Sequence, residues 1–306
     1  MNSEAVTSAH RRLRSEVAAR QSSATGTAPQ VVVGLIGRGI QASKTPFMHE
    51  REGARVGIPY TYVLIDFDAL DLGDDDLGAM LEQVERLGFA GVNVTHPFKQ
   101  SVIKHLSALS PEAAAIGAVN TVVFDGGRRT GHNTDSWGFA ESFREGLADV
   151  PMDSVVQFGA GGAGAAVAHA LVSLGVRQLT LSETEPDRAA RLAARLSERF
   201  SVPVLATSDP TEALATASGL VNASPVGMDK YPGLPFDGAL LRPTHWVAEI
   251  IYFPADTPLL QHARALRCRT LAGTGMAVYQ AVKAFELFTG IAPDRAAMTE
   301  HFRAAA

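Results

Sequence analysis

Ser154-Val155-Val156-Gln157-Phe158-Gly159-Ala160-Gly161-Gly162-Ala163-Gly164 is the stretch that decides the fold of this chain. An apolar run enters a Gly-x-Gly-x-x-Gly turn, and a helical pattern follows over Ala165 to Leu174. A dinucleotide-binding loop needs this strand-turn-helix context. In such a loop Gly159 permits the tight turn, Gly161 lets the backbone approach a pyrophosphate, and Gly164 lets the helix pack on the strand. The helix start offers free N–H groups to phosphates, although a glycine-rich turn can also serve packing alone.

A series of six strands includes this loop. We expect them at Ser154 to Phe158, Gln178 to Leu181, Val202 to Leu205, Gly219 to Asn222, Trp246 to Ile251 and Arg269 to Leu271. Helical patterns separate the strands, and this alternation predicts a doubly wound NAD-binding Rossmann domain over residues 137–272. A helix over Trp137 to Leu147 would lead into the domain from the preceding part of the chain.

An earlier series of strands predicts a separate α/β domain over residues 31–136. We expect strands at Val31 to Ile36, Tyr60 to Ile65, Gly91 to Val94 and Ala118 to Phe124, the last ending at the turn Asp125-Gly126-Gly127. Helical patterns such as Leu77 to Leu87 lie between them and indicate βαβ units and a mostly parallel sheet. Two helices, Thr274 to Phe288 and Pro293 to Arg303, follow the last strand of the chain. We expect residues 273–306 to complete this first domain.

Residues 1–30 have a different composition from the rest of the chain. They are rich in Ala, Ser and Arg and lack the apolar run of a secretory signal. Four arginines suggest a transit peptide, but Glu4 and Glu16 argue against one. We expect a disordered or partly helical extension and a cytoplasmic protein.

The overall composition excludes several classes of protein. Of the 306 residues, 46% are hydrophobic and 19% are charged, as in an ordinary globular protein. The net charge of -5 argues against nucleic acid or an anionic membrane as the main partner, and no apolar run reaches about 18 residues. The single Cys268 rules out an intramolecular disulfide and is expected to be buried. The nine histidines lack metal-ligand spacing, so no metal is expected.

A carboxylate follows the second strand of the nucleotide-binding series. Glu183, in Ser182-Glu183-Thr184, lies about 20 residues past the loop, where it can accept hydrogen bonds from ribose hydroxyls. It would also repel a 2′-phosphate, so the sequence favours NAD over NADP. Arg188 is the nearby basic residue that could serve a phosphate. A solvated surface position is the alternative for both side chains.

Lys99 occupies an unusual place in Asn93-Val94-Thr95-His96-Pro97-Phe98-Lys99. Thr95 or His96 can cap a helix, and Pro97 suits its first position. That predicts Lys99 in the first helical turn, where the positive end of the macrodipole disfavours a cation. A lysine with a lowered pKa is a usable general acid or base near neutral pH. A solvated lysine at the start of a helix is the alternative.

Several short motifs, separated from one another, follow along the chain. They are Gly37 to Pro46 with Met48-His49, Asn93 to Lys99, Gly117 to Thr121, Gly131 to Asp135, the glycine loop, Asn222 to Met228, Ile251 to Pro254 and Gly273 to Ala281. Together they resemble the shikimate dehydrogenase family, most of all its NAD-using quinate/shikimate dehydrogenases of actinobacterial type. The resemblance runs from about Val31 to the end of the chain.

The resemblance implies a catalytic pair and a site for a hydroxylated cyclohexane or cyclohexene carboxylate. Lys99 would transfer the proton of the oxidised hydroxyl, and Asp135 would orient the lysine. The implied substrate residues are Ser43, Thr45, Thr95, Asn120, Tyr252 and Gln280. The implied cofactor residues beyond the glycine loop, Glu183 and Arg188 are Ala223, Ser224, Pro225, Val226, Met228, Gly273 and Met276.

Four of the substrate residues have purely structural alternatives. Thr45 can cap a helix, and Asn120 can pair with backbone at a strand edge. Gln280 shares a helix face with Met276, so it can be a polar residue in a packed seam. Tyr252 can be a core aromatic residue with its hydroxyl satisfied.

Two departures from the family pattern point to the same subgroup. Shikimate-specific members usually carry serine at the position of Thr45, and NADP-using members carry Asn-Arg-Thr where this chain has Ser182-Glu183-Thr184. Both departures fit the quinate/shikimate dehydrogenases that use NAD. An aminoshikimate or aminoquinate substrate, a catalytically silent ligand sensor and a folate-linked dehydrogenase are the alternatives.

We therefore expect a two-domain α/β oxidoreductase with its site in the cleft between the domains. Hydride would pass from a ring carbon of quinate or shikimate to NAD. No metal is needed, because a lysine can stabilise the developing oxyanion. The expected partners are the small carboxylate and NAD, with neither nucleic acid nor membrane, and a homodimer is allowed.

Overall fold

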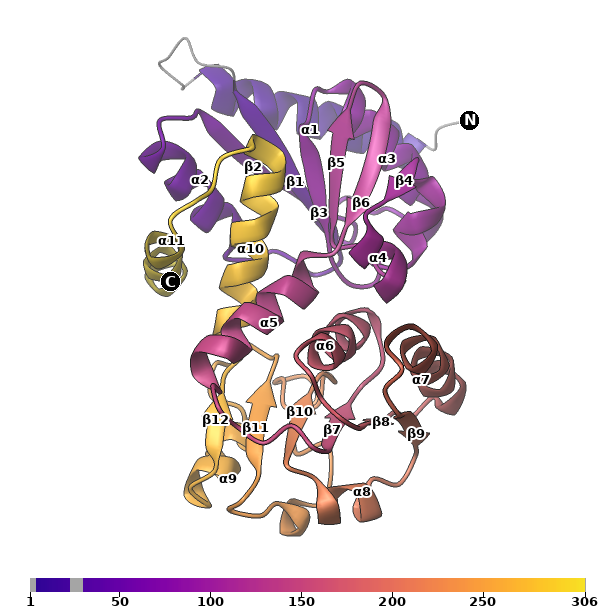
Figure 1. Ribbon diagram of the computed structural model, residues 1–306. Helices are drawn as coiled ribbons and strands as arrows, with labels where there is room; N and C mark the ends of the chain where they lie inside the picture. The colour runs from indigo at the N-terminus through magenta and orange to yellow at the C-terminus, as the bar shows by residue number, and fades with distance from the viewer. Residues whose placement is uncertain (1–3, 23–29, 306) are drawn as a thin grey trace. The chain divides into compact units, whose positions relative to one another are not determined.

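The computed structural model describes residues 4–22 and 30–305 and divides into two compact units (Figure 1). The first unit comprises Met1–Thr134 and Ala281–Ala306, and the second comprises Asp135–Gln280. The sequence placed these divisions after residues 136 and 272. The second division lies inside a helix, α10 (Thr274–Thr289), so a single helix contributes residues to both units.

The sheet of the first unit is mixed, with strand order β2-β1-β3-β5-β6-β4. The strands are β1 (Val31–Gly37), β2 (Tyr60–Asp66), β3 (Gly91–Val94), β4 (Ala108–Leu109), β5 (Thr121–Asp125) and β6 (Arg128–His132). β1 pairs in parallel with β2 and β3, whereas β5 pairs antiparallel with β3 and β6. The sequence missed β6 because Arg-Arg-Thr-Gly-His lacks the apolar alternation of a typical strand. The expected turn is present, and Gly126 and Gly127 adopt the positive φ angles that connect β5 to β6.

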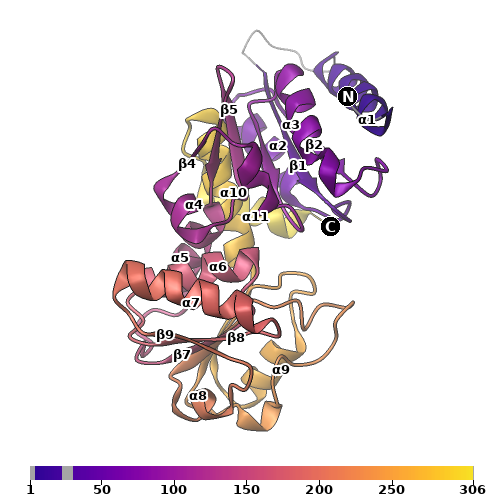
Figure 2. The ribbon, with the colours of Figure 1, turned by 90° about the vertical axis from the view of Figure 1, so that its right-hand side faces the viewer.

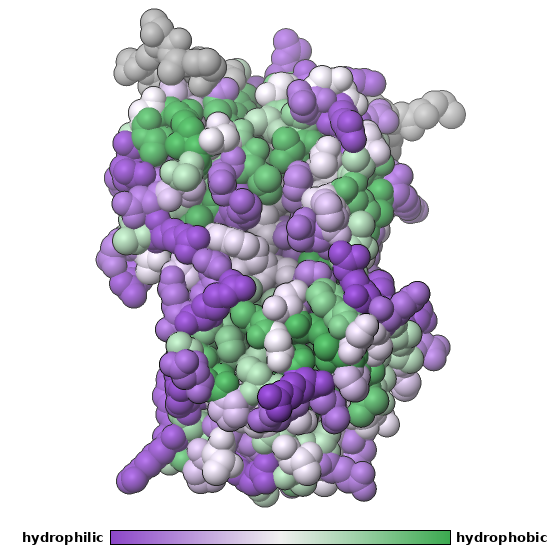
Figure 3. Space-filling view, in the orientation of Figure 1, coloured by the Kyte–Doolittle hydropathy of each residue, from purple (hydrophilic) through white to green (hydrophobic). Residues whose placement is uncertain are grey.

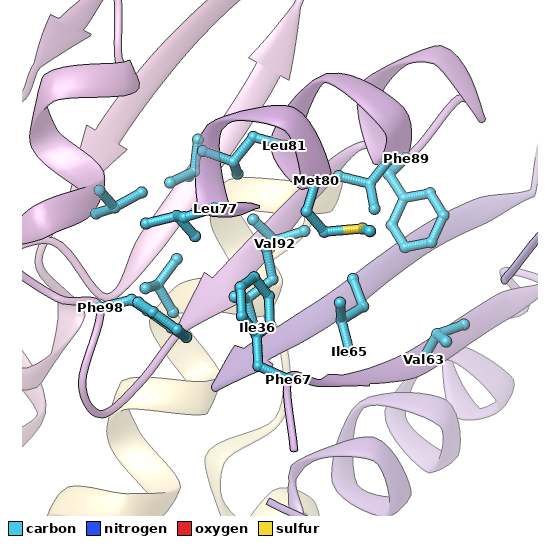
Figure 4. Close-up of a cluster of buried hydrophobic side chains, with 14 of the residues drawn as sticks. Ile36, Val63, Ile65, Phe67, Leu77, Met80, Leu81, Phe89, Val92 and Phe98 are labelled. Atoms are coloured by element: carbon cyan, nitrogen blue, oxygen red, sulfur yellow. The ribbon is translucent and has the colours of Figure 1, made fainter. Parts of the chain in front are cut away.

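The side chains of β1 point alternately to the two faces of this sheet, and helices cover both faces. The helices of the unit are α1 (Glu4–Ser22), α2 (Thr45–Arg55), α3 (Leu77–Arg86), α4 (Pro111–Ile116), α11 (Arg295–Ala304) and part of α10, with 3-10 turns η1 (Asp74–Asp76) and η2 (Ser101–His105). Ile36 lies in a buried cluster with residues of α3 (Figure 4). Val32 belongs to the same cluster. Val33 and Leu35 pack on the opposite side with Phe288 of α10. Figures 1 and 2 show α1 and α3 on one side of the sheet and α10 on the other.

The N-terminal helix α1 is part of the core of the first unit. Its apolar side chains Val6, Ala9, Leu13 and Val17 recur at helical spacing and are buried in the same cluster as α3. Arg20 donates hydrogen bonds to Glu50 (3.0 Å) and to the carbonyl of Tyr62 (3.2 Å). The structure thus has a helix over Glu4–Ser22, which is one of the two forms expected for this extension. Residues 23–29 lie outside the described part of the chain.

The second unit is a doubly wound domain with a fully parallel sheet of order β12-β11-β10-β7-β8-β9. The strands are β7 (Val155–Phe158), β8 (Leu179–Ser182), β9 (Val204–Thr207), β10 (Gly219–Asn222), β11 (Trp246–Glu249) and β12 (Arg269–Leu271). The helices are α5 (Thr134–Gly146), α6 (Gly162–Ser173), α7 (Pro186–Phe200), α8 (Thr211–Thr216) and α9 (Pro258–Ala265), with the 3-10 turn η3 (Gly238–Leu240). The predicted strand series is confirmed. The order reverses between β7 and β10, and dinucleotides bind at such a switch point.

Two expectations from composition concern the interior and the surface. Cys268 is buried, as expected, and its thiol donates to the carbonyl of Arg242 (3.3 Å). Hydrophilic residues are spread over the face shown in Figure 3, with apolar residues between them in separate groups. Within the described residues, no helix combines the length and apolarity that a membrane crossing requires.

Candidate active site

The glycine loop joins β7 to α6 and leaves open space at one of the three glycines that define its Gly-x-Gly-x-x-Gly pattern. A Cβ on Gly159, whose φ is +93°, would lie 2.6 Å from the carbonyl of Ala223, and one on Gly164 would lie 2.4 Å from the carbonyl of Gly159. The protein itself therefore requires these two glycines. A Cβ on Gly161 would meet no atom within 4 Å. Gly161 thus leaves room beside the helix N-terminus, where the N–H groups of Gly162 and Ala163 can receive a pyrophosphate.

A buried amide that sequence reasoning missed fixes the shape of this loop. Gln157 lies in the middle of the apolar run of β7, and its Nε2 donates to the carbonyls of Gly159 and Gly164, each at 2.8 Å. Both ends of the turn are thereby held to one side chain. A polar residue inside a fully buried parallel strand was the available signal, because such strands are normally continuously apolar.

Glu183 lies at the end of β8 and is held by the glycine loop. The N–H of Ala160 donates to its Oε2 (2.9 Å), and the N–H and hydroxyl of Thr184 donate to its Oε1 (2.7 and 3.0 Å). Burial raises the pKa of Glu183, but these hydrogen bonds outweigh that effect, and the pKa lies below its ordinary value. Glu183 is therefore a carboxylate at neutral pH, next to the loop that would carry the phosphates.

Arg188, on α7, is paired with carboxylates. Its guanidinium lies 2.6 Å from Oε1 of Glu185 and 3.7 Å from Oε2 of Glu183. A cation balanced in this way is a poor anchor for a 2′-phosphate, which would also approach Glu183. Arg188 thus belongs to a partly exposed group of ion pairs with Glu183 and Glu185, and its role as a cofactor residue stays a prediction.

The loop after β10 lies against the glycine loop at the switch point. The N–H of Ala223 donates to the carbonyl of Phe158 (2.7 Å). Asn222 closes the next turn, because its Oδ1 accepts from the N–H (3.1 Å) and hydroxyl (2.7 Å) of Ser224 and its Nδ2 donates to the carbonyl of Val226 (2.8 Å). The predicted cofactor residues Ala223, Ser224, Pro225, Val226 and Met228 all belong to this turn or follow it.

Asp135 lies in the first turn of α5, which packs backbone to backbone on α10. A Cβ on Gly138 would lie 2.7 Å from the N atom of Gln280 and 3.0 Å from the carbonyl of Met276. Gly138 therefore lets these helices approach, and it brings the turn of Asp135 to the segment that carries Met276 and Gln280. The packed seam considered as an alternative for Gln280 is present, and Nε2 of Gln280 donates to the carbonyl of Ala277 (2.9 Å).

Tyr252 and Gly273 belong to the same part of the second unit. Burial raises the pKa of Tyr252, and the negative charge of Asp135 raises it further. The Tyr252 residue is nevertheless 44% exposed, which contradicts the alternative of a core aromatic residue. A Cβ on Gly273 would lie 2.4 Å from the carbonyl of Ile250, so this glycine is required for the close approach of two chain segments.

Gly275 and Tyr279, which share a motif with Gln280, serve the packing of α10 on α5. A Cβ on Gly275 would lie 2.1 Å from the hydroxyl of Ser142. The hydroxyl of Tyr279 donates to Oε2 of Glu145 (2.5 Å). These contacts explain both residues without a role in substrate selection.

Lys99 lies in a turn after β3, so the predicted helix start is wrong. Residues 96–100 form turns, and the short η2 that follows has Gln100 as its N-cap. Two backbone carbonyls that a helix would use are bonded to other segments instead. The N–H of Arg38 donates to the carbonyl of His96 (3.2 Å), and the N–H of Val119 donates to the carbonyl of Lys99 (2.7 Å). The macrodipole argument for Lys99 therefore does not apply, and its proposed role rests on the family pattern.

The loop after β1 contacts the loop after β3. It leads on to Ser43 and Thr45, the residues predicted to bind the substrate carboxylate. A Cβ on Gly37 would lie 2.4 Å from Cγ2 of Thr95, so Gly37 admits the Thr95 side chain. The hydroxyl of Ser43 accepts a hydrogen bond from the N–H of Thr45 (3.3 Å). Lys44 is the N-cap of α2, so the capping alternative for Thr45 is wrong. Ser43 and Thr45 are both partly exposed and lie at the start of one helix.

Asn120 is held by a buried polar network in the first unit. Its Oδ1 accepts from the N–H of Thr134 (2.7 Å), and its Nδ2 donates to the hydroxyl of Thr134 (2.8 Å). Behind it, Nδ2 of Asn93 donates to the hydroxyl of Thr121 (2.9 Å), and the hydroxyl of Tyr62 donates to Asn93 (2.8 Å). The N–H of Val119 donates to the carbonyl of Lys99. Asn120 follows Val119 in the chain, so its backbone lies next to the Lys99 turn.

Comparisons with known proteins find two matching family models and several similar proteins. Residues 35–122 match the family described as shikimate dehydrogenase substrate binding domain, and residues 273–301 match the shikimate 5'-dehydrogenase C-terminal domain. A shikimate dehydrogenase (NADP(+)) of Streptomyces avermitilis is 52% identical over 88% of this chain and 93% of its own length. A quinate/shikimate dehydrogenase (NAD(+)) of Corynebacterium efficiens is 47% identical over 86% of this chain and 94% of its own length.

A solved structure is similar over nearly the whole chain. It is a quinate dehydrogenase from Corynebacterium glutamicum in complex with NAD, with a TM-score of 0.85 and 45% identity, and the match covers 90% of this chain and 99% of that one. The relatives are thus alike in fold, but their names divide between NADP and NAD.

Proposed function

The chain belongs to the shikimate dehydrogenase family, and from that premise we propose that it is an NAD-dependent oxidoreductase that acts on a ring hydroxyl of quinate or shikimate. Quinate would become 3-dehydroquinate, and shikimate would become 3-dehydroshikimate. The doubly wound unit supplies the fold for a dinucleotide, and Gly161 leaves the space that a pyrophosphate needs.

The observation that carries the cofactor choice is the carboxylate of Glu183. It is hydrogen-bonded to the N–H of Ala160 in the glycine loop, and its pKa is below the ordinary value. An ionised carboxylate there can accept hydrogen bonds from the ribose hydroxyls of NAD. It would repel the 2′-phosphate of NADP, and Arg188 is already paired with Glu185. The NAD-using relatives therefore supply the better guide to this chain.

We assign the proton transfer to Lys99 and the binding of substrate oxygens to its neighbours. Nζ of Lys99 would take the proton of the hydroxyl that is oxidised and stabilise the oxygen as charge develops. The amide of Asn120 would hold a ring hydroxyl, and the hydroxyls of Ser43 and Thr45 would hold the carboxylate. When bound, NAD supplies the acceptor for the hydride that leaves the ring carbon. The pairing of Lys99 with Asp135 stays a prediction of the family pattern.

Initial-rate assays test the proposal directly. Quinate, shikimate and an amino analogue are each offered with NAD and with NADP. We expect turnover of quinate or shikimate, with kcat/KM for NAD at least about tenfold above that for NADP, because a like charge at the ribose disfavours the phosphate. A preference for NADP contradicts the assignment of Glu183.

The same assays separate the remaining alternatives. Faster turnover of the amino analogue would identify an aminoshikimate or aminoquinate dehydrogenase. NAD binding without oxidation of any of the three acids would identify a ligand-sensing relative. The homodimer allowed by the sequence also stays a prediction, which light scattering of the purified protein checks.

A further inference from the structure

One buried carboxylate of the second unit has no part in the roles described so far. Glu249 ends β11, is 1% exposed, and follows the apolar residues Trp246 to Ala248. A carboxylate removed from water is costly unless hydrogen bonds replace its hydration. Glu249 therefore needs donors from its surroundings, and their identity shows what it holds in place.

Three chain segments donate hydrogen bonds to this carboxylate. Nδ2 of Asn222, at the end of β10, lies 3.1 and 3.0 Å from the two oxygens of Glu249. The N–H of Ile251 donates to Oε1 (3.0 Å), and the hydroxyl of Thr257 donates to Oε2 (3.1 Å). Thr257 is the N-cap of α9. One side chain thus joins the ends of two neighbouring parallel strands to the helix that follows them.

The segments joined in this way carry the predicted cofactor residues. Asn222 also shapes the turn that follows it through its bonds to Ser224 and Val226. Tyr252 follows directly on Ile251. Both segments leave the carboxyl edge of the sheet, where a doubly wound domain binds its dinucleotide. Glu183 lies at the end of β8, on the opposite side of the switch point from these segments.

We propose that Glu249 is a positioning residue for NAD, which holds the Asn222–Met228 loop and the Ile251-Tyr252 backbone in the arrangement that receives the nicotinamide half of the cofactor. The proposal rests on the proposed function of the chain. It deepens that function, because Glu249 would act through these segments without contact to the cofactor. The glycine loop has its own anchor in Gln157, so a change at Glu249 should leave the pyrophosphate side intact.

The test is Glu249→Gln, which keeps the size of the side chain but replaces one acceptor oxygen with a donor. At a pH above the pKa of Glu249, which is about 7, we expect the Kd and KM for NAD to rise about tenfold, the usual effect of losing a hydrogen bond to a charged group. The KM for quinate or shikimate should stay within about twofold. Titration calorimetry gives the Kd without turnover.

The matched control is Glu52→Gln in the first unit. Glu52 is also buried, accepts from the N–H of Asp294 (2.8 Å) and pairs with Arg55 (2.8 Å). The same chemical change there should affect stability and leave the Kd for NAD unchanged. A folded Glu249→Gln protein with wild-type NAD constants overturns the proposal, and so does an equal rise in the Glu52→Gln control.

A second pair of variants covers the case in which Glu249→Gln does not fold. Thr257→Val removes one donor to Glu249, whereas Thr257→Ser keeps the hydroxyl. We expect about a threefold rise in the Kd for NAD in the valine variant relative to the serine variant, and equal values overturn the proposal. If the wild-type protein binds NAD but oxidises none of the acids, the proposed function fails, while the Kd comparison still tests Glu249.

Discussion

In the proposed function, one side chain, that of Glu183, discriminates between two cofactors that differ by one phosphate. The side chain of Glu183 is 9% exposed, and its carboxylate is fixed by hydrogen bonds from Ala160 and Thr184. A fixed acceptor loses little entropy when it binds a ribose hydroxyl, and it cannot turn away from a 2′-phosphate. The identity of this residue therefore bears on cofactor choice more than overall similarity does, since relatives of nearly equal identity are named for different cofactors.

Replacement of Glu183 by Ala should relax the preference for NAD. We expect kcat/KM for NAD to fall and that for NADP to rise, so that their ratio changes by at least about tenfold. Steady-state kinetics with both cofactors measures the ratio. Glu198→Ala, at an exposed position of α7, the helix that follows Glu183 in the chain, is the control and should leave the ratio as it is. An unchanged ratio in the Glu183 variant would sink the ribose assignment.

Replacement of Lys99 by Ala tests the proton-transfer assignment. We expect turnover to fall by at least about 100-fold, because general acid–base catalysis typically contributes this much. The Kd for NAD should not change, since the predicted NAD residues belong to the second unit. Lys104→Ala, at an exposed position of η2, controls for the loss of a nearby positive charge. Near-normal turnover of the Lys99 variant would be incompatible with the assignment.

At the scale of elements, α1 shows how a polar-looking extension can belong to the core. Most of its residues are hydrophilic, but one face carries Val6, Ala9, Leu13 and Val17. These four side chains are buried in the same cluster as the apolar residues of α3. Such a helix is stabilised by burial of its apolar stripe and not by its intrinsic propensity. Residues outside the motifs therefore still determine the stability of the first unit.

Leu13→Ala tests whether α1 contributes to that stability. Leu13 is 2% exposed, and truncation of a buried leucine commonly lowers the free energy of unfolding by about 2–5 kcal/mol. Thermal unfolding followed by circular dichroism should show a lower midpoint than in Arg12→Ala, which alters an exposed position of the same helix. Equal midpoints for the two variants would mean that α1 is dispensable for the first unit.

At the scale of the whole molecule, the predicted cofactor residues and most of the predicted substrate residues come from two different kinds of sheet. The parallel sheet of the second unit ends all of its strands at one edge, which gathers the loops that suit a dinucleotide. The mixed sheet of the first unit instead brings Thr95, Lys99 and Asn120 close to one another through loop contacts and a buried polar network. Buried polar groups in both units also make the stability of the protein depend on pH.

The pH dependence of stability should carry a contribution from Glu249. Burial raises the pKa of its carboxyl from 4.5 to about 7, so the folded protein keeps a proton that the unfolded chain has lost. The contribution is fully present below pH 4.5 and disappears as the pH rises to about 7. It corresponds to on the order of 3 kcal/mol.

Comparison with Glu249→Gln isolates this contribution, because glutamine does not titrate. Unfolding by urea from acid to neutral pH should show the wild type losing stability relative to the variant as the pH rises. Asp66 and Glu183 have lowered pKa values, so they act in the opposite direction and are common to both proteins. A constant difference between the two proteins over this range would contradict the raised pKa of Glu249.

The sequence by itself determined the elements whose signal is local. The Gly-x-Gly-x-x-Gly loop and the six strands of the second unit could be predicted because strand, turn and helix follow one another within about 20 residues. Glu183 could be placed for the same reason, since a fixed offset from the loop puts it at the end of the next strand. The family motifs likewise named Lys99, Asp135 and the substrate residues.

Only the tertiary structure decided the features that depend on contacts between distant segments. Lys99 lies in a turn and not in a helix because Val119 and Arg38 bond to carbonyls of its loop. Gln157 and Glu249 are polar residues in apolar strands, and their roles become visible only with their hydrogen-bond partners. Local periodicity reports which residues are buried, but it carries no information about which distant groups satisfy a buried polar atom.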